Sequence, residues 1–488
     1  MSGAASGKLG VLPLAALVVG AMIGGGIFSL PQNMAQDASA GAVCTAWIIT
    51  GIGIFFLVNT FRILSIVKPD ATTGIYSYAR LGFGKFAGFQ MAWAYWLCNI
   101  FGNVGYAVLL MDACNYFFPG RFTGGNNLWS IIGGSLIIWV MNYAVWRGVR
   151  QAAFINIVGT IAKLLPLAIF IVIMFWVFRW HNFADDFTGH TDLPLGVKPL
   201  GGMLGQVKST MLVTLWAFIG IEGAVVISGR AKTSRSVGLA TLLGFLICLV
   251  IYALISLLPF GVMSQHQLSG LANPSTAPLL QQVVHGRWGG DLMNIGVIIA
   301  LLSSWLAFTI MVSQIPFAAA QDGTFPRIMS RSNRFGSPGV SLITTSVIMQ
   351  LSMLIVYFAS NAWNTMLSIT GVMILPPYLG CTLYLWQIAD RPDFPSSLGI
   401  DRHFARFCGI AGSAYALWMI YAAGLKYLLL AFTFQLIGIP IYLWTRSREE
   451  HQHSWRKLLT VPEQYAAGLI LLISCIGIIA FATGKINL

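Results

Sequence analysis

The chain has 488 residues, of which 57% are hydrophobic and only 9% are charged. Because roughly a quarter of the residues of an ordinary soluble protein are charged, this composition excludes a soluble globular or a disordered protein. Lys and Arg outnumber Asp and Glu by 28 to 15. In so apolar a chain, this excess predicts cytoplasmic loops beside a lipid bilayer and no nucleic-acid partner.

Apolar runs long enough to cross a bilayer, which takes about 20 residues, recur along the whole chain. The last pairs are the least distinct, because little more than Gly424 and Lys426 separates two of the runs. The sequence therefore predicts an all-α polytopic membrane protein with 12–13 transmembrane helices. In chain order they lie near residues 11–35, 42–66, 86–117, 128–146, 152–178, 203–229, 237–261, 291–320, 340–359, 363–387, 408–424, 427–445 and 464–484.

The basic residues alternate between the two sides of these spans. If the N-terminus is cytoplasmic, 20 of the 28 Lys and Arg residues fall in cytoplasmic loops and 7 in external loops. Such a positive-inside pattern predicts a multi-pass protein with its N-terminus in the cytoplasm. Lys163 is the only basic residue well inside a span.

The cysteines and histidines do not form the patterns of an enzyme or a metal site. The seven cysteines lie mostly within or beside spans without a CxxC spacing, and the seven histidines lie in predicted loops. Isolated cysteines in apolar surroundings are typical of small packing residues. We expect no metal, no cofactor and no enzyme activity.

Acidic residues within the spans are scarce. Glu222 is the only glutamate before residue 449, and it lies in the middle of the sixth span. A charge at the bilayer centre costs about 3 kcal/mol even on lenient insertion scales, so Glu222 is a candidate to face a substrate. The alternative is a carboxyl group that is kept protonated or is paired with a neighbouring helix. Asp112, late in the third span, is expected to be structural or to lie in an outer vestibule.

Glycines interrupt two of the spans. Gly24, Gly25 and Gly26 lie within the first span, and Gly220 and Gly223 flank Glu222 in the sixth. Backbone groups freed by such breaks are tolerated at membrane depth only where the chain lines a cavity. Close helix packing through a GxxxG motif is the alternative for the first span. Interrupted spans in corresponding halves predict a transporter built from two inverted repeats, spans one to five and six to ten.

Three segments resemble a known family. They are Gly20 to Ala35 (GAMIGGGIFSLPQNMA), Trp216 to Glu222 (WAFIGIE) and Gln321 to Pro326 (QDGTFP). They resemble the basic amino acid/polyamine antiporters of the amino acid-polyamine-organocation (APC) superfamily. The GGGIFSLPQN form and the thirteenth span are most similar to bacterial arginine/ornithine antiporters.

The resemblance implies a LeuT-like fold of 5+5 inverted repeats with interrupted helices 1 and 6. The transporter core is expected over residues 1–445, with repeat one over about 10–180, repeat two over about 200–387 and two further helices. A basic cytoplasmic loop is expected over residues 446–463, and an additional C-terminal transmembrane helix over residues 464–488.

The resemblance also implies a substrate site at the two breaks. The substrate α-carboxylate is expected at the backbone N–H groups of Gly24, Gly25 and Gly26, where a half-helix begins. Glu222 would sense the cationic substrate. The other implied contacts are the carbonyls near Ile23 and at Trp216 and Ile219, the Trp216 ring as a lid, and the third-span positions Tyr95, Cys98, Asn99 and Asn103.

Two further positions depart from the family or leave alternatives open. Arginine/agmatine exchangers stack the guanidinium on a tryptophan of the eighth span, where this chain has Phe308, with Trp305 one turn earlier. Either ring can make a cation–π contact or simply pack in the membrane, and the substitution leaves ornithine and lysine plausible. Lys163 resembles a fifth-span lysine of proton-coupled members, so it either couples protons or is a fixed cation that ties the fifth span to the first.

We therefore expect an antiporter in the cytoplasmic (inner) membrane of a bacterium that exchanges arginine for ornithine by alternating access. Proton-coupled uptake of cationic amino acids remains an alternative, as does exchange of lysine with cadaverine, arginine with agmatine or histidine with histamine. The expected partners are cationic amino acid and diamine substrates and the lipid bilayer, and a homodimer is compatible with the resemblance.

Overall fold

The computed structural model describes residues 10–69, 71, 75–148, 152–189, 199–222, 234–392, 394–395, 399–450, 458–484 and 486. This part of the chain contains helices and no strand. In order, the helices are α1 (Val11–Met22), η1 (Gly25–Ser29), α2 (Leu30–Ala35), α3 (Ala40–Val67), α4 (Tyr76–Asn115), η2 (Thr123–Gly125), α5 (Leu128–Arg147), α6 (Ala152–Val177), α7 (Trp180–Asp185), α8 (Met203–Ala217), α10 (Ser234–Leu257), η4 (Leu258–Gly261), α11 (Gln265–Ser269), α12 (Thr276–Val283), α13 (Arg287–Gln321), η5 (Arg327–Ser330), α14 (Gly339–Val356), α15 (Ala362–Ala389), α16 (Arg402–Glu450) and α18 (Val461–Ala482).

Ten of these helices are long and apolar enough to cross a membrane, or eleven when the bent pair α1 and η1–α2 counts as one span. The prediction of an all-α polytopic membrane protein is confirmed. The number falls below thirteen for two reasons. α16 is counted once, although it consists of two helices that meet at a kink at Gly424 (φ 76°, ψ 162°) and that correspond to the two spans predicted between 408 and 445. α8 has only 15 residues, and the continuation of the sixth span lies outside the described residues.

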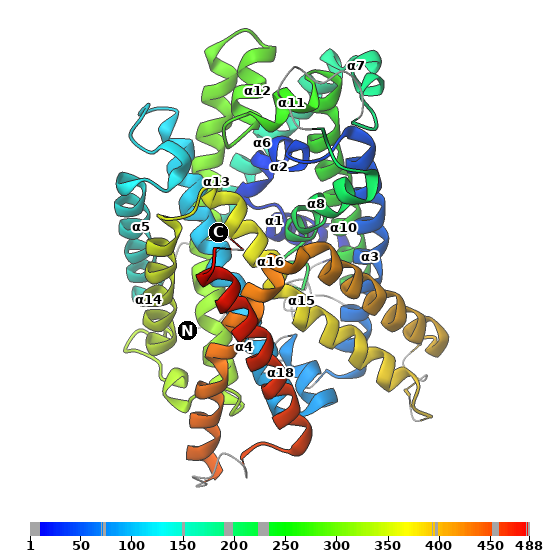
Figure 1. The fold of residues 1–488 in the computed structure, drawn as a ribbon, viewed down its shortest axis with the longest axis vertical. Coiled ribbons are helices and arrows are strands. Elements are labelled where there is room, and N and C mark those ends of the chain that lie inside the picture. The colour runs from blue at the N-terminus through cyan, green and yellow to red at the C-terminus, as the bar shows by residue number, and fades with distance from the viewer. Residues whose placement is uncertain are drawn as a thin grey trace.

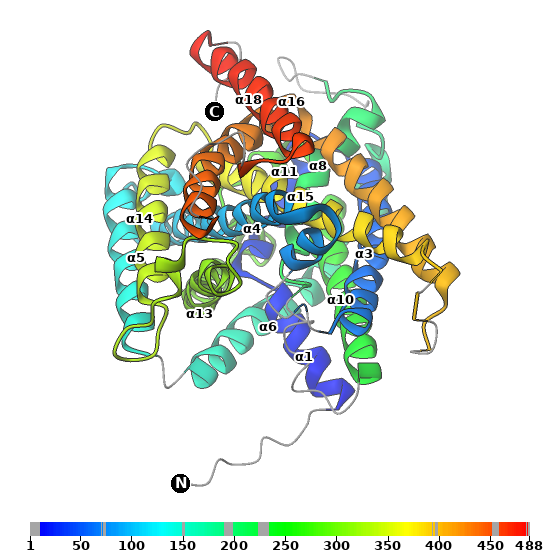
Figure 2. The same ribbon diagram turned by 90° about the horizontal axis from the view of Figure 1, so that it is seen from below.

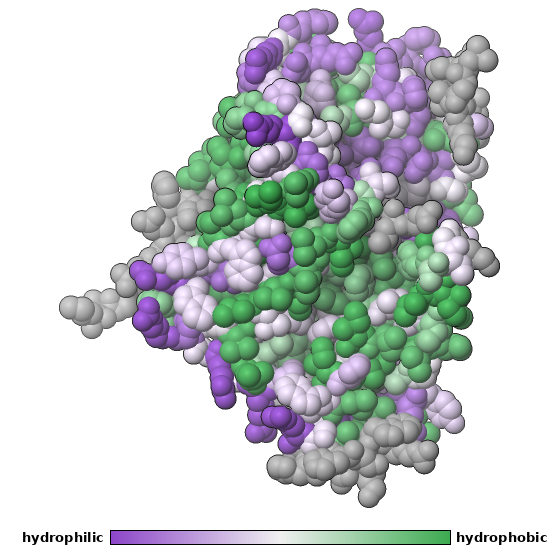
Figure 3. Space-filling model, turned by 60° about the vertical axis from the view of Figure 1, so that its left-hand side comes forward, coloured by the Kyte–Doolittle hydropathy of each residue, from purple (hydrophilic) through white to green (hydrophobic). Residues whose placement is uncertain are grey.

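The surface matches a protein embedded in lipid. Apolar side chains gather in a band across the middle of the molecule, with hydrophilic side chains above and below it (Figure 3). α18 contributes exposed apolar residues such as Leu472 and Ile479. α16 continues to Glu450 and α18 begins at Val461, so the segment between them is shorter than the loop predicted over 446–463.

The long helices α4 and α15 run through the centre of the bundle, between the pair α5 and α14 and the pair α3 and α10 (Figure 2). The short helices α2, α7, α11 and α12 gather at one end of the molecule, at the top of Figure 1. We call this end the α12 face. At the opposite end, an ion pair of 3.0 Å between Arg80 and Asp322 joins the start of α4 to the end of α13.

The first span is broken where the glycines predict it. α1 ends at Met22, and the chain is extended at Ile23 (ψ 97°) and Gly24 (ψ −179°) before it resumes as η1 and α2. The two halves meet at an angle of 55°. α8 likewise ends at Ala217 and gives way to turns that reach Glu222, while Gly223 lies outside the described residues. The two breaks predicted from the glycines are therefore the places where helical hydrogen bonding stops.

Candidate functional site: a pocket at the two helix breaks

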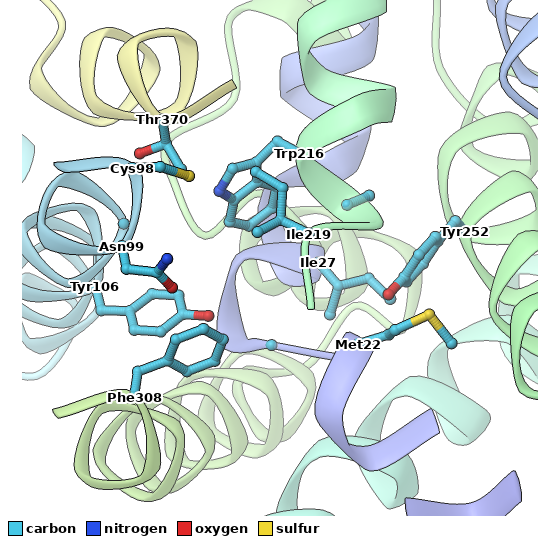
Figure 4. Close-up of a pocket in the computed structure, with 13 residues that line it drawn as sticks. Met22, Ile27, Cys98, Asn99, Tyr106, Trp216, Ile219, Tyr252, Phe308 and Thr370 are labelled. Carbon is cyan, nitrogen blue, oxygen red and sulfur yellow. The ribbon is translucent and has the colours of Figure 1, made fainter. Parts of the chain in front are cut away.

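A small buried pocket lies between the two breaks. Side chains from α4, α13 and α15 form one part of its wall, and Met22, Ile27 and Tyr252 form another (Figure 4). Its free volume is about 30 Å³, which holds about two water molecules and no amino acid. The lining residues are Met22, Gly24, Ile27, Cys98, Asn99, Gly102, Tyr106, Trp216, Ala217, Ile219, Tyr252, Phe308 and Thr370.

The glycines of the first break leave room for two aromatic side chains that a Cβ atom would displace. A Cβ atom on Gly24 would lie 2.7 Å from the Tyr106 hydroxyl oxygen, and one on Gly26 would lie 1.9 Å from Cη2 of Trp216. Neither glycine has a positive φ, so the conformation itself would accept other residues. The aromatic rings of α4 and α8 can reach the backbone of the first span only because these side chains are missing.

The same break leaves backbone donors without partners. Among the described residues, the N–H groups of Gly24, Gly25 and Gly26 donate no hydrogen bond. Gly25 and Gly26 are buried, and buried N–H groups are almost always paired. Three adjacent free N–H groups at a helix break are suited to an anionic group such as a carboxylate. The carbonyl of Trp216 already accepts a hydrogen bond from the Ile219 N–H.

Trp216 is held over the break by a second tryptophan. Its ring meets that of Trp363, at the start of α15, edge to face with 5.4 Å between centroids. The Trp363 indole N–H donates to Oδ1 of Asn33 in α2 at 3.2 Å, and Asn33 in turn donates to Asn364. The sixth span, the tenth span and the η1–α2 half of the first span are thereby joined beside the pocket.

Glu222 does not line the pocket. Its carboxylate is buried and accepts hydrogen bonds from the hydroxyls of Tyr95 (3.0 Å) and Tyr378 (2.8 Å) and from the Gly220 N–H (3.1 Å). Gly220 has a φ of 106°, which L side chains rarely adopt, and this turn brings its N–H to the carboxylate. No ion pair within the described residues includes Glu222. Three neutral donors therefore solvate the acid.

Several buried polar atoms around the pocket have no partner among the described residues. They include Oδ1 of Asn99 and Oγ1 of Thr370, which both belong to residues of the lining, and both amide atoms of Asn103 one turn further along α4. The other amide atom of Asn99 donates to the Tyr95 carbonyl at 2.8 Å. Native proteins leave few buried polar atoms unpaired. The unpaired atoms of Asn99, Asn103 and Thr370 therefore indicate a place where a ligand or water binds.

The eighth span contributes one of its two candidate aromatic rings. Phe308 lines the pocket and meets Tyr106 edge to face, with 5.7 Å between ring centroids. Trp305 is fully buried outside the lining, and its indole N–H has no partner among the described residues. Phe308 is thus the ring that faces the cavity.

Lys163 lies in α6, away from the pocket. Its side chain is 4% exposed, and Nζ donates to the Gly20 carbonyl of α1 at 3.4 Å. The ammonium group therefore contacts the α1 half of the broken span, one turn before the break.

Of the residues expected at the site, six line the pocket and seven surround it. Those in the lining are Gly24, Cys98, Asn99, Trp216, Ile219 and Phe308. Those outside it are Ile23, Gly25, Gly26, Tyr95, Asn103, Glu222 and Trp305. Sequence analysis missed Tyr106, which its spacing could have revealed, because positions 95, 99, 103 and 106 recur on one face of a helix. It also missed Tyr252, Tyr378 and Thr370, for which no local signal exists.

A membrane-embedded bundle with a broken first helix, an unwound sixth helix and a polar pocket between them defines a polytopic carrier of the APC type. Comparison with protein families agrees, because the model for amino acid permeases matches residues 9–483. The chain belongs to this family of the APC superfamily. The resemblance to basic amino acid/polyamine antiporters is confirmed by the names of its relatives.

The relatives match almost the whole chain. A putative amino-acid transporter of Clostridium perfringens is 54% identical over 474 residues, covering 97% of this chain and 98% of its own. Arginine/agmatine antiporters of Chlamydia felis and Chlamydia pneumoniae are each 53% identical, over 482 and 483 residues, covering 99% of this chain and 98% and 99% of theirs. The thirteenth predicted span is thus shared with proteins named for agmatine, so it does not single out the ornithine branch.

The close approach of Trp216 to Gly26 can be tested by adding one methyl group. Gly26→Ala should lower the exchange rate of the substrate about tenfold or more, because its Cβ occupies the space of the indole ring and overpacking costs about 1–3 kcal/mol. The measurement is exchange by purified protein in proteoliposomes. Gly205→Ala in α8 is the matched control, since nothing lies within 4 Å of its added Cβ. Equal exchange by both variants would show that the ring does not need to seat on the break.

Proposed function

We propose that the protein is an antiporter that takes up arginine and releases its decarboxylation product, agmatine, through the pocket at the two breaks. The observation that carries this proposal is the set of buried and unpaired polar groups, with free N–H donors at Gly24, Gly25 and Gly26 and free acceptors on Asn99 and Thr370. Donors suit the α-carboxylate of an amino acid, and acceptors suit its cationic groups. The names of the Chlamydia relatives support arginine and agmatine as the pair.

In this arrangement the substrate is held between the helix breaks. The α-carboxylate takes the free N–H groups of the first break, and the α-ammonium takes backbone carbonyls at Ile23 and Ile219. The side-chain cation lies near Asn99 and over the Phe308 ring, where a cation–π contact of about 1–2 kcal/mol is available in a dry site. The pocket must expand to admit it, and Trp216, held only by edge contacts and the Trp363 network, is the ring that we expect to move.

We propose that Glu222 supplies the negative charge that a cationic substrate needs at membrane depth. It lies behind Tyr95, one turn of α4 from the pocket residues Cys98 and Asn99. The two tyrosine hydroxyls keep the carboxylate solvated while the pocket is empty. A rotation of either tyrosine would let the acid and the substrate cation interact.

Ornithine is the second candidate for the exported product, and Phe308 is the observation that favours it. A phenylalanine holds a guanidinium less tightly than a tryptophan does, which weakens discrimination against an ammonium. The two pairs differ in charge. Arginine and ornithine each carry a net charge of +1, whereas agmatine has lost the carboxylate and carries +2.

We further propose that the α12 face is external, that the N-terminus is cytoplasmic and that the protein lies in the inner membrane of a bacterium. The basic loops support the orientation, and the Clostridium and Chlamydia relatives are bacterial. Residues 1–445 form the transporter core in this proposal, and 464–488 add a further helix. The homodimer stays a prediction.

Counterflow under voltage should distinguish the two exchange pairs. Proteoliposomes loaded with agmatine should take up labelled arginine, and one net positive charge leaves the vesicle in each cycle. An inside-positive potential of 100 mV should therefore favour exchange by about 2.3 kcal/mol, or about 50-fold in the equilibrium ratio. Ornithine-loaded vesicles should show no such dependence. Uptake driven by ornithine but not by agmatine would reject agmatine as the product, and lysine, cadaverine and histamine complete the panel.

Removing the charge of Glu222 should abolish exchange without preventing folding. Glu222→Gln keeps an acceptor and a donor for the two tyrosines, so only the charge is lost. The loss of a buried charge interaction costs about 2–5 kcal/mol, which predicts a fall in arginine counterflow of about 30- to several-thousand-fold. Glu222→Ala should show the same loss, and Glu463→Gln, at the start of α18, serves as a control. Normal counterflow by Glu222→Gln would contradict this role.

We propose that Lys163 is a fixed cation that holds α6 against α1, because Nζ already donates to the Gly20 carbonyl. Exchange should then be indifferent to an imposed pH gradient, and Lys163→Met should slow arginine exchange with every internal substrate alike. Arginine uptake into empty vesicles driven by a pH gradient alone would instead establish proton coupling. Fluorescence-detected gel filtration of each variant controls for folding.

A further inference from the structure

A large cavity opens at the α12 face. Its volume is about 640 Å³, which lies in the range of small-molecule sites and far exceeds the central pocket. The end of α4, the loop before α12, α12 itself and the start of α13 form its wall. We call it the vestibule. The residues that line it are Asp112, Asn115, Tyr116, Ala272, Asn273, Pro274, Ala277, Pro278, Gln281, Gln282, His285, Gly286, Arg287 and Asn294.

The charges of the vestibule favour a cation. Asp112 is the carboxylate in its lining, and no ion pair of the described residues includes it. The backbone N–H of Gly124 is its hydrogen-bond partner. The guanidinium of Arg287, which also belongs to the lining, pairs with Asp291 at 3.6 Å and lies over the Tyr116 ring.

The remaining lining supplies polar groups that suit an amino acid or an amine. Side-chain amides of Asn115, Gln281 and Gln282 surround the cavity. The side-chain amide oxygen (Oδ1) of Asn273 is buried and has no partner among the described residues. Oδ1 of Asn115 accepts from the Phe122 N–H and Oε1 of Gln281 accepts from the Tyr116 hydroxyl. The Asp112 carboxylate and the unpaired Asn273 oxygen are therefore the acceptors that these groups offer to an incoming cation.

Two helices connect the vestibule with the central pocket. Asp112 follows Tyr106 by six residues of α4, which is about 9 Å along a helix axis. Asn294 precedes Phe308 by fourteen residues of α13, or about 21 Å. The same helices therefore present one cavity at the membrane surface and the other at membrane depth.

The wall of the vestibule is also bonded to the outer half of the broken first span. The Gln32 N–H of α2 donates to Oγ of Ser275 at 3.1 Å, and Nδ2 of Asn273 donates to Oε1 of Gln32 at 3.3 Å. Nε2 of Gln265 in α11 donates to the Ala35 carbonyl at 2.6 Å. These hydrogen bonds join α2 to the α11–α12 segment, so the wall of the vestibule is bonded to the half of the first span that follows the break.

We propose that the vestibule is a second binding site for the cationic substrate, in which the Asp112 carboxylate captures the guanidinium or ammonium group before it enters the central pocket. This inference rests on the proposed cationic substrate. It assigns Asp112 a positioning role in external capture, whereas Glu222 acts at membrane depth. The site serves the α12 face alone, so its loss should affect transport from one side of the membrane.

The test compares the two sides of the membrane. Asp112→Asn should raise the external arginine concentration for half-maximal exchange about five- to tenfold in whole cells, with the maximal rate unchanged within about twofold. Inside-out vesicles from the same cells should show an unchanged half-saturating concentration. Asp37→Asn is the matched control, because Asp37 is an exposed acid beside α2 that does not line the vestibule.

A second variant leaves Asp112 in place. Gln282 is an exposed residue of the vestibule wall, so Gln282→Lys should fold normally while its added cation repels the substrate. It should raise the external half-saturating concentration as Asp112→Asn does. Equal effects of Asp37→Asn and Asp112→Asn, equal effects on the two sides, or no effect of either vestibule variant would overturn the proposal. Failure of wild-type counterflow would reject the proposed function instead.

Discussion

The fold of the site depends on the absence of side chains at the break in the first helix. Gly24 and Gly26 admit the Tyr106 hydroxyl and the Trp216 ring at distances that a Cβ atom would forbid. Helical hydrogen bonding stops at the same place, and three N–H groups are left without a partner among the described residues. The unpaired N–H groups and the space that the Trp216 ring occupies thus lie at the same three residues, so a substitution that disturbs one disturbs the other.

The polar groups of the site fall into two kinds. Glu222 is fully satisfied by two tyrosine hydroxyls and a backbone N–H, whereas Asn99 and Thr370 keep unpaired oxygens toward the pocket. A carboxylate without hydrogen-bond partners in so small a cavity would lower the stability of the fold more than the neutral acceptors do, since burying an unpaired charge costs far more free energy than burying an unpaired amide. The Glu222 carboxylate therefore lies outside the pocket lining, and the neutral side chains of Asn99 and Thr370 line the pocket.

The sequence predicts the parts of this arrangement that depend on local chemistry. The three glycines predict the break, the isolated Glu222 predicts a membrane-depth acid, and Gly20 to Ala35 indicates the family. Tyr378 escapes prediction because it meets Glu222 across 156 residues of sequence, and no spacing rule reaches so far. The boundary at Gly424 is predictable, since the kink lies between the two apolar runs of 408–424 and 427–445.

The two cavities divide the work of a carrier between surface and depth. A cationic substrate must lose water to enter the central pocket. If this pocket alone bound the substrate tightly enough to capture it from solution, it would also release the substrate slowly. A vestibule with one carboxylate and many amides raises the local concentration of cations at a modest cost in desolvation. Because the vestibule wall is hydrogen-bonded to α2, the segment that a surface-bound cation touches is bonded to the half of the broken helix that follows the break. Capture at the surface and access to the depth are therefore linked through the same six residues, Leu30–Ala35.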